Sequence, residues 1–574
     1  MGYRDVYEKW ISDPGIDQAT KDELLAIAGD EREIEDRFFR DLEFGTGGLR
    51  GVLGAGSNRL NIYTIRKATQ GLANYILKAD DYVPGMGVAI AHDSRRMSPE
   101  FTMEAALVFN ANGIKTYVFD SLRPTPLLSF AVRYLGCIAG IVITASHNPP
   151  EYNGYKAYWS DGGQCTSPRD NDIIAEVNNI TDFSMIQTMG HAEAVKNGLY
   201  CFAPPDVDDA YVANVRACCI NADIIPDSDI KIVFTPLHGA GNIPVRRVLK
   251  ESGFRHVHVV PEQEMPNGEF PTVSYPNPED VAAYACALKL AEKVDADVVI
   301  ATDPDADRVG VAVKHGGERT VLTGNMVGAI LTEYLLSQMQ AAGRLPQNSA
   351  VISTIVSTDM GKKIAESYDA TYIDVLTGFK FIGEKMNEFE ETGNHSYILG
   401  YEESYGYLAG TYARDKDAVV ASLLICEAVA YYKRQGLSLC DVMQNLYTKH
   451  GVHLELTTSL TMKGAEGLQD IKRIMEGLRA NPPESLGGSK LVEARDYLSE
   501  KIRYLPDGRE APTGLPISDV LYFVMENGSW ACVRPSGTEP KIKLYFGVCL
   551  PSTASMDEAN AKIKTLEEDL KAKI

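Results

Sequence analysis

Three stretches of the chain share one alternation of apolar and polar segments. In each, an apolar run of strand length leads into a polar turn, then into residues with helical spacing, and then into a second apolar run. The three stretches cover residues 87–119, 232–260 and 351–375. A strand, a helix and a strand within about 30 residues form a βαβ unit, whose two strands are parallel. Because the pattern recurs at wide spacing, the sequence predicts three related α/β domains with mixed, mainly parallel sheets.

The two ends of the chain follow other patterns. Residues 1–44 are acidic and have helical spacing, which predicts N-terminal helices. Near the other end, the apolar runs 520–525 and 530–533 flank Asn527-Gly528, a pair typical of the tight turn of a β-hairpin. A further apolar run and a helix rich in Glu and Lys follow. This end therefore predicts an α+β domain with an antiparallel sheet.

The chain has 574 residues, which is too long for a single hydrophobic core. We place domain boundaries near residues 205, 320 and 450, where one segment of the pattern gives way to the next. The predicted domains are 1–205, which includes the N-terminal helices, 206–320, 321–450 and 451–574.

Two polar loops begin where buried strands are predicted to end. Thr144–Pro149 follows the apolar run 139–143, and Asp303–Arg308 follows the run 296–301. In open α/β sheets, ligands bind at the carboxyl ends of the strands. The first loop offers the hydroxyl of Ser146, and the second offers three carboxylates. A nucleophile together with a site for a hard cation is the simplest joint interpretation.

The three carboxylates belong to Asp303, Asp305 and Asp307, at alternate positions of their loop. Buried carboxylates are costly unless a cation or hydrogen-bond donors compensate them, and oxygen ligands of this kind suit Mg²⁺. The alternative is an acidic surface turn. A calcium loop is excluded, because the later glycine and the bidentate Glu of such loops are missing. Ser146, taken alone, also fits the cap of a helix.

Four further segments offer groups that bind anions or sugar hydroxyls. Lys156 lies ten residues beyond Ser146 and is a proton-transfer group, a charge clamp or an ordinary surface lysine. Segment 534–541 combines a guanidinium, two hydroxyls and a glycine, the composition of an anion-binding nest, with a plain hairpin turn as the alternative. Segment 400–406 presents Glu and Ser at alternate positions, and segment 377–380 follows a predicted strand and also fits a helix cap.

Composition narrows the choice of partners. The net charge of −22 argues against nucleic acid or an anionic membrane. No apolar run approaches the roughly 20 residues of a membrane span, and the N-terminus lacks the apolar core of a secretion signal. Ten cysteines without a CxxC pair indicate reduced thiols and a cytoplasmic protein. An anionic small substrate needs local basic residues, and the candidate loops contain them.

Four of these segments resemble, in order, the four signatures of the α-D-phosphohexomutase superfamily. They are Thr-Ala-Ser146-His-Asn-Pro, Asp303-Pro-Asp305-Ala-Asp307-Arg308, Gly-Tyr-Glu402-Glu403-Ser404 and Arg534-Pro-Ser536-Gly537-Thr538. The similarity covers essentially the whole chain, and the segments Phe44–Gly51 and Thr377–Lys380 most resemble the phosphoglucomutase/phosphopentomutase branch. The resemblance implies four domains around a central cleft, each of which contributes one loop.

The resemblance also implies a phosphoryl-transfer reaction. Ser146 would carry a phosphoryl group, and Mg²⁺ would be held by that phosphate together with Asp303, Asp305 and Asp307. Transfer of this kind needs positioning and charge neutralisation more than covalent machinery. The phosphoryl group would pass to a sugar monophosphate, and the resulting bisphosphate would reorient and return its other phosphoryl group to Ser146.

The roles of the remaining residues follow from the same resemblance. Arg534, Ser536, Gly537 and Thr538 would hold the phosphate that does not react, Glu402 and Ser404 would bind sugar hydroxyls, Lys156, Arg50 and Lys380 would serve proton transfer and charge stabilisation, and His147, Arg308, Thr377 and Gly378 would complete the substrate-binding set.

We therefore expect an intramolecular phosphotransferase that interconverts glucose 1-phosphate and glucose 6-phosphate, with glucose 1,6-bisphosphate as intermediate and activator. Phosphopentomutase and phosphomannomutase activities are the alternatives, because Tyr401 stands between the glycine and Glu402 and departs from the sugar loop of the family. A metal-dependent phosphatase fits less well, since it does not need to bind both ends of its substrate. A non-catalytic sugar-phosphate sensor would be expected to have lost Ser146 or an aspartate. We expect a monomer or a weak dimer.

Overall fold

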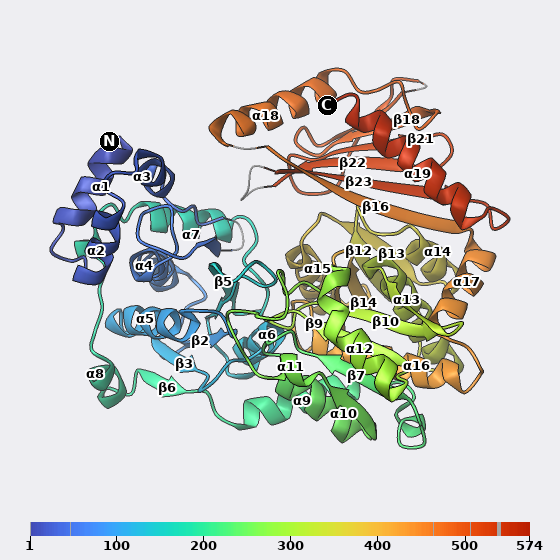
Figure 1. The fold of residues 1–574 in the computed structure, drawn as a ribbon, viewed down its shortest axis with the longest axis horizontal. Coiled ribbons are helices and arrows are strands. Elements are labelled where there is room, and N and C mark those ends of the chain that lie inside the picture. Colours follow the sequence, from blue (N-terminus) through green and yellow to red (C-terminus); the bar gives the residue numbers. More distant parts are fainter. Residues whose placement is uncertain (1, 46–47, 463, 506, 537–540) are drawn as a thin grey trace. The chain divides into compact units, whose positions relative to one another are not determined.

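The computed structural model describes residues 2–45, 48–462, 464–505, 507–536 and 541–574, of which 464–466 and 468 are described by their backbone alone (Figure 1). By its internal contacts the chain divides into two compact units. The first unit comprises Met1–Leu322, Phe379–Gly393 and Tyr405–Tyr431, and the second comprises Thr323–Gly378, Asn394–Ser404 and Tyr432–Ile574. The chain thus leaves the first unit after Leu322 and returns to it twice. Within the described ranges, every helix is too short or too polar to cross a membrane.

The N-terminal segment is helical, as its spacing predicts. It forms α1 (Tyr3–Ser12), α2 (Gln18–Ala26) and α3 (Glu31–Phe38). Asp17 and Asp30 cap α2 and α3 by accepting backbone N–H groups with their side chains. Trp10 of α1 is 5% exposed and packs edge-on against Phe183, which joins these helices to the α/β domain that follows.

The first sheet is mixed. Its strands β1 (Gly48–Val52), β2 (Gly87–His92), β3 (Lys115–Val118), β4 (Ala139–Ile143), β5 (Tyr152–Trp159) and β6 (Tyr200–Phe202) lie in the order β1-β5-β4-β2-β3-β6. Strand β2 pairs in parallel with β3 and β4, whereas β5 is antiparallel to both β4 and β1. The helices of this region are α4 (Ile62–Lys78), α5 (Ser98–Ala111), α6 (Thr125–Tyr134), α7 (Arg169–Asn178) and α8 (His191–Lys196).

The second sheet repeats this plan. Strands β7 (Lys231–Thr235), β8 (His256–Val259), β9 (Val298–Thr302), β10 (Val309–His315) and β11 (Glu318–Leu322) lie in the order β11-β10-β9-β7-β8. Strand β7 is parallel to β8 and β9, and β10 is antiparallel to β9. The helices here are α9 (Asp206–Ala217), α10 (Asn242–Ser252), α11 (Pro261–Glu264) and α12 (Ala285–Val294). The returning segments of the first unit form α15 (Phe379–Thr392), β15 (Gly406–Ala409), which is not a strand of this sheet, and α16 (Ala418–Lys433), whose last two residues belong to the second unit.

The second unit begins with the third βαβ pattern. Strand β12 (Ser349–Thr354) is parallel to β13 (Thr371–Val375) and to β14 (Ser396–Glu402), with helices α13 (Gly324–Ala341), α14 (Met360–Ser367) and α17 (Leu439–His450). In all three predicted βαβ units the two strands are therefore parallel neighbours.

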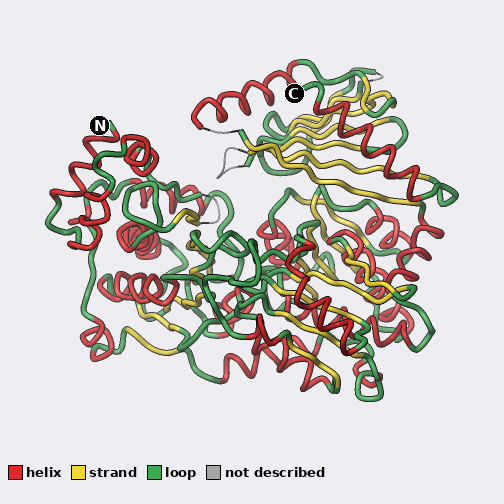
Figure 2. Tube along the Cα trace, in the orientation of Figure 1, coloured by secondary structure: helices red, strands yellow, loops and turns green. Residues whose placement is uncertain are grey.

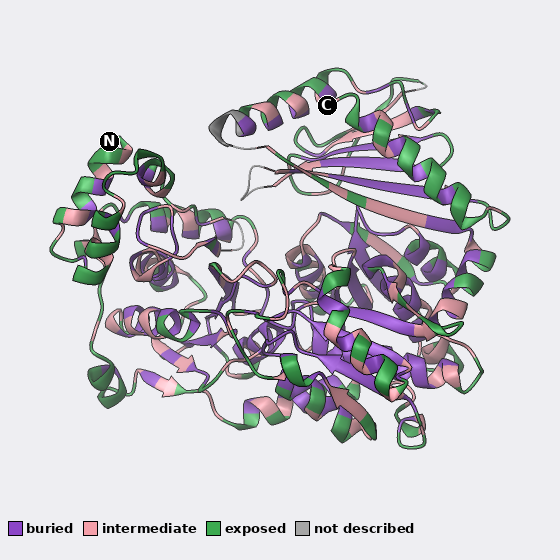
Figure 3. Cartoon of the chain, viewed as in Figure 1, coloured by how far each residue is buried: buried purple, intermediate pink, exposed green. Residues whose placement is uncertain are grey.

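An antiparallel sheet completes the second unit (Figure 2). Its strands are β16 (Val452–Thr461), β17 (Ser485–Leu486), β18 (Ser489–Asp496), β19 (Lys501–Tyr504), β20 (Glu510–Pro512), β21 (Leu521–Met525), β22 (Trp530–Pro535) and β23 (Lys541–Leu550), with helices α18 (Gly464–Ala480) and α19 (Met556–Lys571). The predicted hairpin is β21–β22, and Gly528 takes the positive φ of 81° that its turn requires. Strands β22 and β23 are largely buried (Figure 3). The predicted fold class, three α/β domains with mixed sheets and a C-terminal α+β domain with an antiparallel sheet, is confirmed.

Both candidate loops of the first unit follow fully buried strands, β4 and β9. Each loop then turns back into an antiparallel strand, β5 or β10. The alternative that Ser146 caps a helix is therefore wrong, because a strand follows its loop. The two loops reach the same edge of their sheets for the reason predicted, which is that each begins where a central strand ends.

We expect Gly71→Ala to destabilise the first unit. Gly71 lies in α4 against α7, and a Cβ there would lie 2.4 Å from Cγ2 of Val177 and 2.7 Å from its Cα. Because backbone atoms of α7 would have to move, we expect a loss of about 1–3 kcal/mol in the free energy of unfolding. Thermal unfolding followed by circular dichroism should show the lower Tm.

Gly477→Ala is the matched control. Gly477 lies on α18, is exposed, and has open space where a Cβ would be added. Alanine has the higher helix propensity by about 1 kcal/mol, so the Tm should stay or rise. If Gly71→Ala has the same Tm as the unaltered protein, the close packing of α4 on α7 is contradicted.

Candidate active site

The Ser146 loop is held in a conformation that its own residues do not favour. Ser146 has a left-handed φ of 52° and is 2% exposed, an arrangement that costs a residue with a Cβ about 1–2 kcal/mol. Its N–H donates to Oγ1 of Thr144 at 2.8 Å, and that hydroxyl donates to Oδ2 of Asp93 at 2.6 Å. The loop is thus fastened to the buried carboxylate of the turn after β2.

Arg95 is the second fastening of this loop. The Arg95 guanidinium is buried and lies 3.3 Å from the Asp93 carboxylate. It donates hydrogen bonds to the carbonyl oxygens of Ser146, Asn148, Pro149 and Tyr152. One side chain therefore satisfies four carbonyls that would otherwise be buried without donors. Arg95 is not among the site residues predicted from the sequence, although a charged pair at the carboxyl end of the strand β2 is a usable signal.

The three aspartates of the second loop lie together and are buried. Asp303, Asp305 and Asp307 are at most 2% exposed, and one carboxylate oxygen of each lies within 4.8 Å of the others. The loop curls around Asp303, whose Oδ1 accepts the backbone N–H groups of Asp307 at 3.1 Å and Arg308 at 3.0 Å. Oδ2 of Asp303 accepts a hydrogen bond from Oγ of Ser146 at 2.6 Å. The structure thus brings the predicted nucleophile and the predicted cation site into direct contact.

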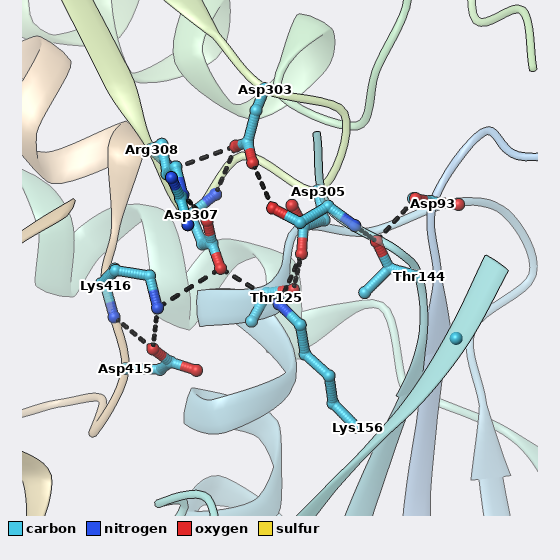
Figure 4. Close-up of polar contacts among 12 residues, drawn as sticks. Asp93, Thr125, Thr144, Lys156, Asp303, Asp305, Asp307, Arg308, Asp415 and Lys416 are labelled. Carbon is cyan, nitrogen blue, oxygen red and sulfur yellow. Dashed lines mark hydrogen bonds and ion pairs between the residues drawn. The ribbon is translucent and has the colours of Figure 1, made fainter. Parts of the chain in front are cut away.

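Two lysines compensate the other two carboxylates (Figure 4). Nζ of Lys156 lies 2.8 Å from Oδ2 of Asp305 and 3.1 Å from Oδ2 of Asp307. Nζ of Lys416 lies 3.4 Å from the same Asp307 oxygen and 2.9 Å from Oδ1 of Asp415. Lys156 reaches the site because it stands on β5, in register with Val142 of β4. These contacts fit a charge clamp and do not fit an ordinary surface lysine.

These contacts shift the pKa values of the carboxyl groups in opposite directions. Burial raises the pKa of Asp303 well above its usual range, and the neighbouring Asp305 and Asp307 raise it further. Burial also opposes ionisation of Asp307, but Lys156, Lys416 and Arg308 outweigh it and lower the pKa of that group. Asp303 is therefore harder to ionise than Asp307, although the two carboxyl groups belong to one loop.

The carboxylate group fits a hard divalent cation. Oδ1 of Asp305 and Oδ1 of Asp307 are buried and accept no hydrogen bond from the described residues. Unpaired buried carboxylate oxygens are costly unless a cation compensates them, and carboxylate oxygens are the protein ligands that Mg²⁺ prefers. We conclude that Asp303, Asp305 and Asp307 are the residues that can hold such an ion.

Four further predicted residues of the first unit lie at different distances from this centre. Nδ1 of His147 is 3.3 Å from Oγ of Ser146, and burial, Arg308 and Arg50 lower the pKa of this imidazole. Arg50 donates to the side chain of Asn148 at 3.3 Å. Arg308 pairs with Glu279. His147 and Arg308 therefore belong to the two loops themselves, and Arg50 borders the first.

Lys380 is placed elsewhere. Its Nζ lies 3.4 Å from Oδ2 of Asp170 in α7, and its ammonium also lies over the ring of Phe381. The described contacts thus tie Lys380 to α7, and none of them connects it with the Ser146 loop.

The sugar-loop residues lie in the second unit. Glu402, at the end of β14, is 5% exposed, and its Oε1 accepts the N–H of Gly378 at 3.0 Å. The structure therefore brings together segments 377–380 and 400–406, which the sequence identified separately. Gly378 has a φ of 125°, in the region that favours glycine. Thr377 and Ser404 are half-buried beside these two residues in sequence.

The predicted phosphate loop is described in part. Arg534 stands on β22, in register with Lys543 of β23, and the N–H of Ser536 donates to the carbonyl of Lys541 at 2.7 Å. The predicted residues Gly537 and Thr538 lie outside the described residues. A cationic strand pair thus leads into this loop.

Lys416 is a second residue of the site that was not predicted from the sequence. It belongs to the run Arg414-Asp415-Lys416-Asp417, which directly precedes the apolar helix α16. All four residues are buried. Alternating charges immediately before an apolar helix are an unusual pattern and were the available signal, since buried charges require partners.

Comparisons with known proteins point to one family in every matched part of the chain. Four family models match, described as phosphoglucomutase/phosphomannomutase alpha/beta/alpha domains I, II and III and the C-terminal domain, over residues 41–183, 209–317, 323–450 and 486–564. A phosphoglucomutase of Staphylococcus haemolyticus is 36% identical over 515 residues, which cover 90% of this chain and 91% of that protein. One of Staphylococcus aureus is 36% identical over 542 residues, covering 93% and 94%.

A solved structure shows the same fold. The open form of parafusin, a phosphoglucomutase from Paramecium, matches 93% of this chain and 95% of its own with a TM-score of 0.69 at 17% identity. At this identity the likeness concerns the fold alone.

We expect Asp305→Asn to weaken the binding of Mg²⁺. A ligand that binds the folded state stabilises it by about 2.7 kcal/mol at one hundred times its Kd, so added MgCl₂ should raise the Tm of the unaltered protein. The substitution keeps the side-chain shape and removes one of the three carboxylates from the candidate cation site. The rise in Tm with MgCl₂, measured by differential scanning calorimetry, should shrink or require more Mg²⁺.

Asp295→Asn is the control for this experiment, because Asp295 belongs to the same sheet region and its carboxylate is exposed. It should keep the full response to MgCl₂. An Asp305→Asn protein with the same Mg²⁺ titration as the control would remove Asp305 from the cation site.

Proposed function

The chain belongs to the phosphoglucomutase/phosphomannomutase family, an enzyme family of intramolecular phosphotransferases, and from this premise we propose that it interconverts glucose 1-phosphate and glucose 6-phosphate. One observation carries the proposal: the Ser146 hydroxyl lies 2.6 Å from a buried group of three carboxylates that can hold a divalent cation. The names of the relatives at 36% identity support glucose as the sugar.

In this proposal Ser146 is the residue that carries the phosphoryl group between substrates. Asp303 orients its hydroxyl, and Thr144 and Arg95 fix its backbone. Asp303, Asp305 and Asp307 would hold Mg²⁺, which would supply charge neutralisation for phosphoryl transfer. Lys156 holds an ammonium beside Asp305 and Asp307, in a position to stabilise the same charge. Preorganised charges of this kind are the main contribution of proteins to phosphoryl transfer.

Other residues of the first unit have supporting roles in the proposal. Arg50, through its contact with Asn148, places a guanidinium beside the Ser146 loop, and His147 and Arg308 contribute to substrate binding there. The ion pair between Lys380 and Asp170 is not what we expect for a group that serves proton transfer at Ser146. We therefore assign proton transfer and charge stabilisation to Lys156 in preference to Lys380.

The second unit supplies the recognition of sugar and distal phosphate. Glu402 and Ser404 bind sugar hydroxyls, with Thr377 and Gly378 behind them; the hydrogen bond from Gly378 to Glu402 supports this grouping. Arg534, Ser536, Gly537 and Thr538 hold the phosphate that does not react, in either orientation of a glucose 1,6-bisphosphate intermediate. A guanidinium gives the bidentate geometry that phosphate recognition favours.

The runner-up functions keep the same chemistry with mannose or a pentose as the sugar, because Tyr401 alters the spacing of the sugar loop. We also propose that the enzyme acts in the cytoplasm, as a monomer or weak dimer on small sugar phosphates. All ten cysteines have free thiols, which supports a reducing compartment. The four predicted segments, 1–205, 206–320, 321–450 and 451–574, are proposed as its domains.

We expect Ser146→Ala to abolish mutase activity and to leave the fold intact, because the phosphoryl group has no other hydroxyl to occupy at that position. A coupled assay should convert glucose 1-phosphate to glucose 6-phosphate in the presence of Mg²⁺ and a trace of glucose 1,6-bisphosphate. The same assay with mannose, ribose and deoxyribose 1-phosphates identifies the preferred sugar.

Ser552→Ala is the matched control, since Ser552 is exposed and follows β23 far along the chain from either loop. It should keep full activity. Normal turnover by Ser146→Ala would refute the carrier role. Release of free phosphate without isomerised sugar would indicate a phosphatase instead of a mutase.

We expect Arg534→Ala to raise KM with a smaller effect on kcat. Loss of a charge-assisted hydrogen bond to phosphate costs about 1.5–3 kcal/mol, which corresponds to roughly a ten- to hundredfold rise. Steady-state kinetics with glucose 1-phosphate measures both constants. An unaltered KM would move the phosphate site to other residues.

A further inference from the structure

Phe270 is a buried aromatic residue in a loop of the first unit, and the proposed function gives it no role. It follows α11, and it is the one buried residue within 265–275, a stretch that the structure describes throughout. It is 0% exposed. Its φ of 45° lies in the left-handed region, which residues with a Cβ rarely adopt. Such a conformation persists only where the surrounding contacts enforce it, and it is common at functional sites.

The ring of Phe270 packs against Arg95, the residue that fastens the Ser146 loop. Cζ of Arg95 lies over this ring, 5.1 Å from its centroid, a distance at which a cation is attracted to the ring face. Both residues are almost fully buried, so water screens the attraction weakly. Arg95 donates to its four carbonyls through Nη1 and Nη2. A guanidinium donates in its own plane, so these bonds leave movement out of that plane to be restricted by the ring.

Residues 265–273, which we call the strap, also pack against the backbone of the turn that contains Arg95. A Cβ added at Gly268 of the strap would lie 2.7 Å from the backbone nitrogen of Arg96 and 2.8 Å from the carbonyl oxygen of Ser94. The strap can approach this closely only because glycine has no Cβ. It therefore contacts the residue on each side of Arg95 as well as the guanidinium.

The strap is also anchored to the turn between β7 and α10. Nδ1 of His238 lies 3.1 Å from the carbonyl oxygen of Met265, and Nε2 lies 3.0 Å from Oγ1 of Thr272. The N–H of Asn267 donates to the carbonyl of His238 at 3.2 Å. His238 is 3% exposed. Both ring nitrogens and the carbonyl of one buried histidine thus hold the strap.

The turn that contains His238 packs in turn against the Asp303–Arg308 loop. The N–H of Ala240 donates to the carbonyl of Pro304 at 2.7 Å. A Cβ added at Gly239 would lie 2.4 Å from Cα of Pro304. The strap therefore connects a turn that contacts the carboxylate loop with the arginine that fastens the loop of the serine.

We propose that Phe270 is a positioning residue for phosphoryl transfer, which holds Arg95 against the carbonyls of the Ser146 loop and so fixes the serine hydroxyl beside the carboxylates. The inference rests on the proposed function, because it takes Ser146 as the phosphoryl carrier. Phe270 acts through Arg95, and the strap ties the serine loop to the carboxylate loop. Phosphoryl transfer depends on such positioning, and a displacement of about 1 Å can reduce a rate about a hundredfold.

Phe270→Leu tests this role, because it keeps an apolar side chain and removes the ring face. In the coupled assay with glucose 1-phosphate, kcat should fall about tenfold or more, with KM nearly unchanged. We expect this split because the substrate-binding residues stay in place while the nucleophile is displaced. Phe270→Tyr keeps the ring and should restore most of kcat.

Amide hydrogen exchange, followed by mass spectrometry, tests the position of the loop without turnover. A desolvated cation–π contact corresponds to a factor of about ten to thirty in an equilibrium constant. In Phe270→Leu protein, peptides that cover residues 144–152 should therefore exchange faster by up to that factor. Peptides that cover β9 should exchange as in the unaltered protein.

Replacement of Phe270 by trifluorophenylalanine separates the attraction to Arg95 from simple filling of space. Fluorine withdraws electron density from the ring face and weakens its attraction for a cation, while the ring keeps nearly its size. The fluorinated protein should show the changes of Phe270→Leu in smaller measure. A ring that only fills space would leave both kcat and the exchange of residues 144–152 unaltered.

Phe39→Leu is the matched control. Cζ of Arg40 also lies 5.1 Å from the centroid of the Phe39 ring, but Phe39 is 49% exposed and caps the C-terminus of α3. Loss of this second cation–π pair should leave kcat and the exchange of residues 144–152 unchanged.

The outcomes distinguish the inference from the function on which it rests. Unchanged kcat and unchanged exchange of residues 144–152 in Phe270→Leu protein that is folded by circular dichroism overturn the positioning role and leave the mutase proposal standing. If Phe270→Leu does not fold, the fluorinated protein decides, and its equality with the unaltered enzyme overturns the role. Absence of mutase activity in the unaltered enzyme, together with faster loop exchange in Phe270→Leu, overturns the proposed function and not the contact.

Discussion

The need to compensate three buried carboxylates governs the centre of the first unit. Asp303, Asp305 and Asp307 occupy one short loop, at most 2% exposed, where isolated anions would be prohibitively costly. Backbone N–H groups and a serine hydroxyl compensate Asp303, and two lysines compensate the other two. The oxygens that accept no hydrogen bond from the described residues are where a cation can bind. Charge balance therefore links Ser146, the lysines and the three carboxylates in one network.

The surrounding fold supplies these partners from distant parts of the chain. Lys156 comes from β5, which runs antiparallel to the strand before the Ser146 loop. Residues 405–418 begin the returning segment Tyr405–Tyr431. They are hydrogen-bonded at both ends to the Asp303–Arg308 loop or the residue after it: the N–H of Val309 donates to the carbonyl of Tyr405, and the N–H of Ala418 to that of Ala306. The βαβ framework thus presents the loops, and the irregular returning segment completes their charge compensation.

The sequence allowed the framework and the loops to be predicted because both depend on local patterns. A buried strand followed by a polar turn is visible in the residues themselves, and Ser146 and Asp303 lie where such strands end. Arg95 and Lys416 escaped notice because their importance depends on tertiary partners that no local pattern specifies. Lys380 was predicted to act near Ser146, but it contacts Asp170. Its position depends on the tertiary contact between α15 and α7, which the sequence pattern does not specify.

The position of Lys416 in the chain has a consequence for biosynthesis. The ribosome releases the Asp303–Arg308 loop well before residues 405–418. For part of translation, Asp307 therefore lacks one of its two ammonium partners. The first unit cannot reach its final electrostatic balance until the third βαβ unit has been synthesised and the chain has returned to the first unit. Charge compensation of Asp307 is therefore completed late in synthesis, although Ser146 and the three carboxylates emerge early.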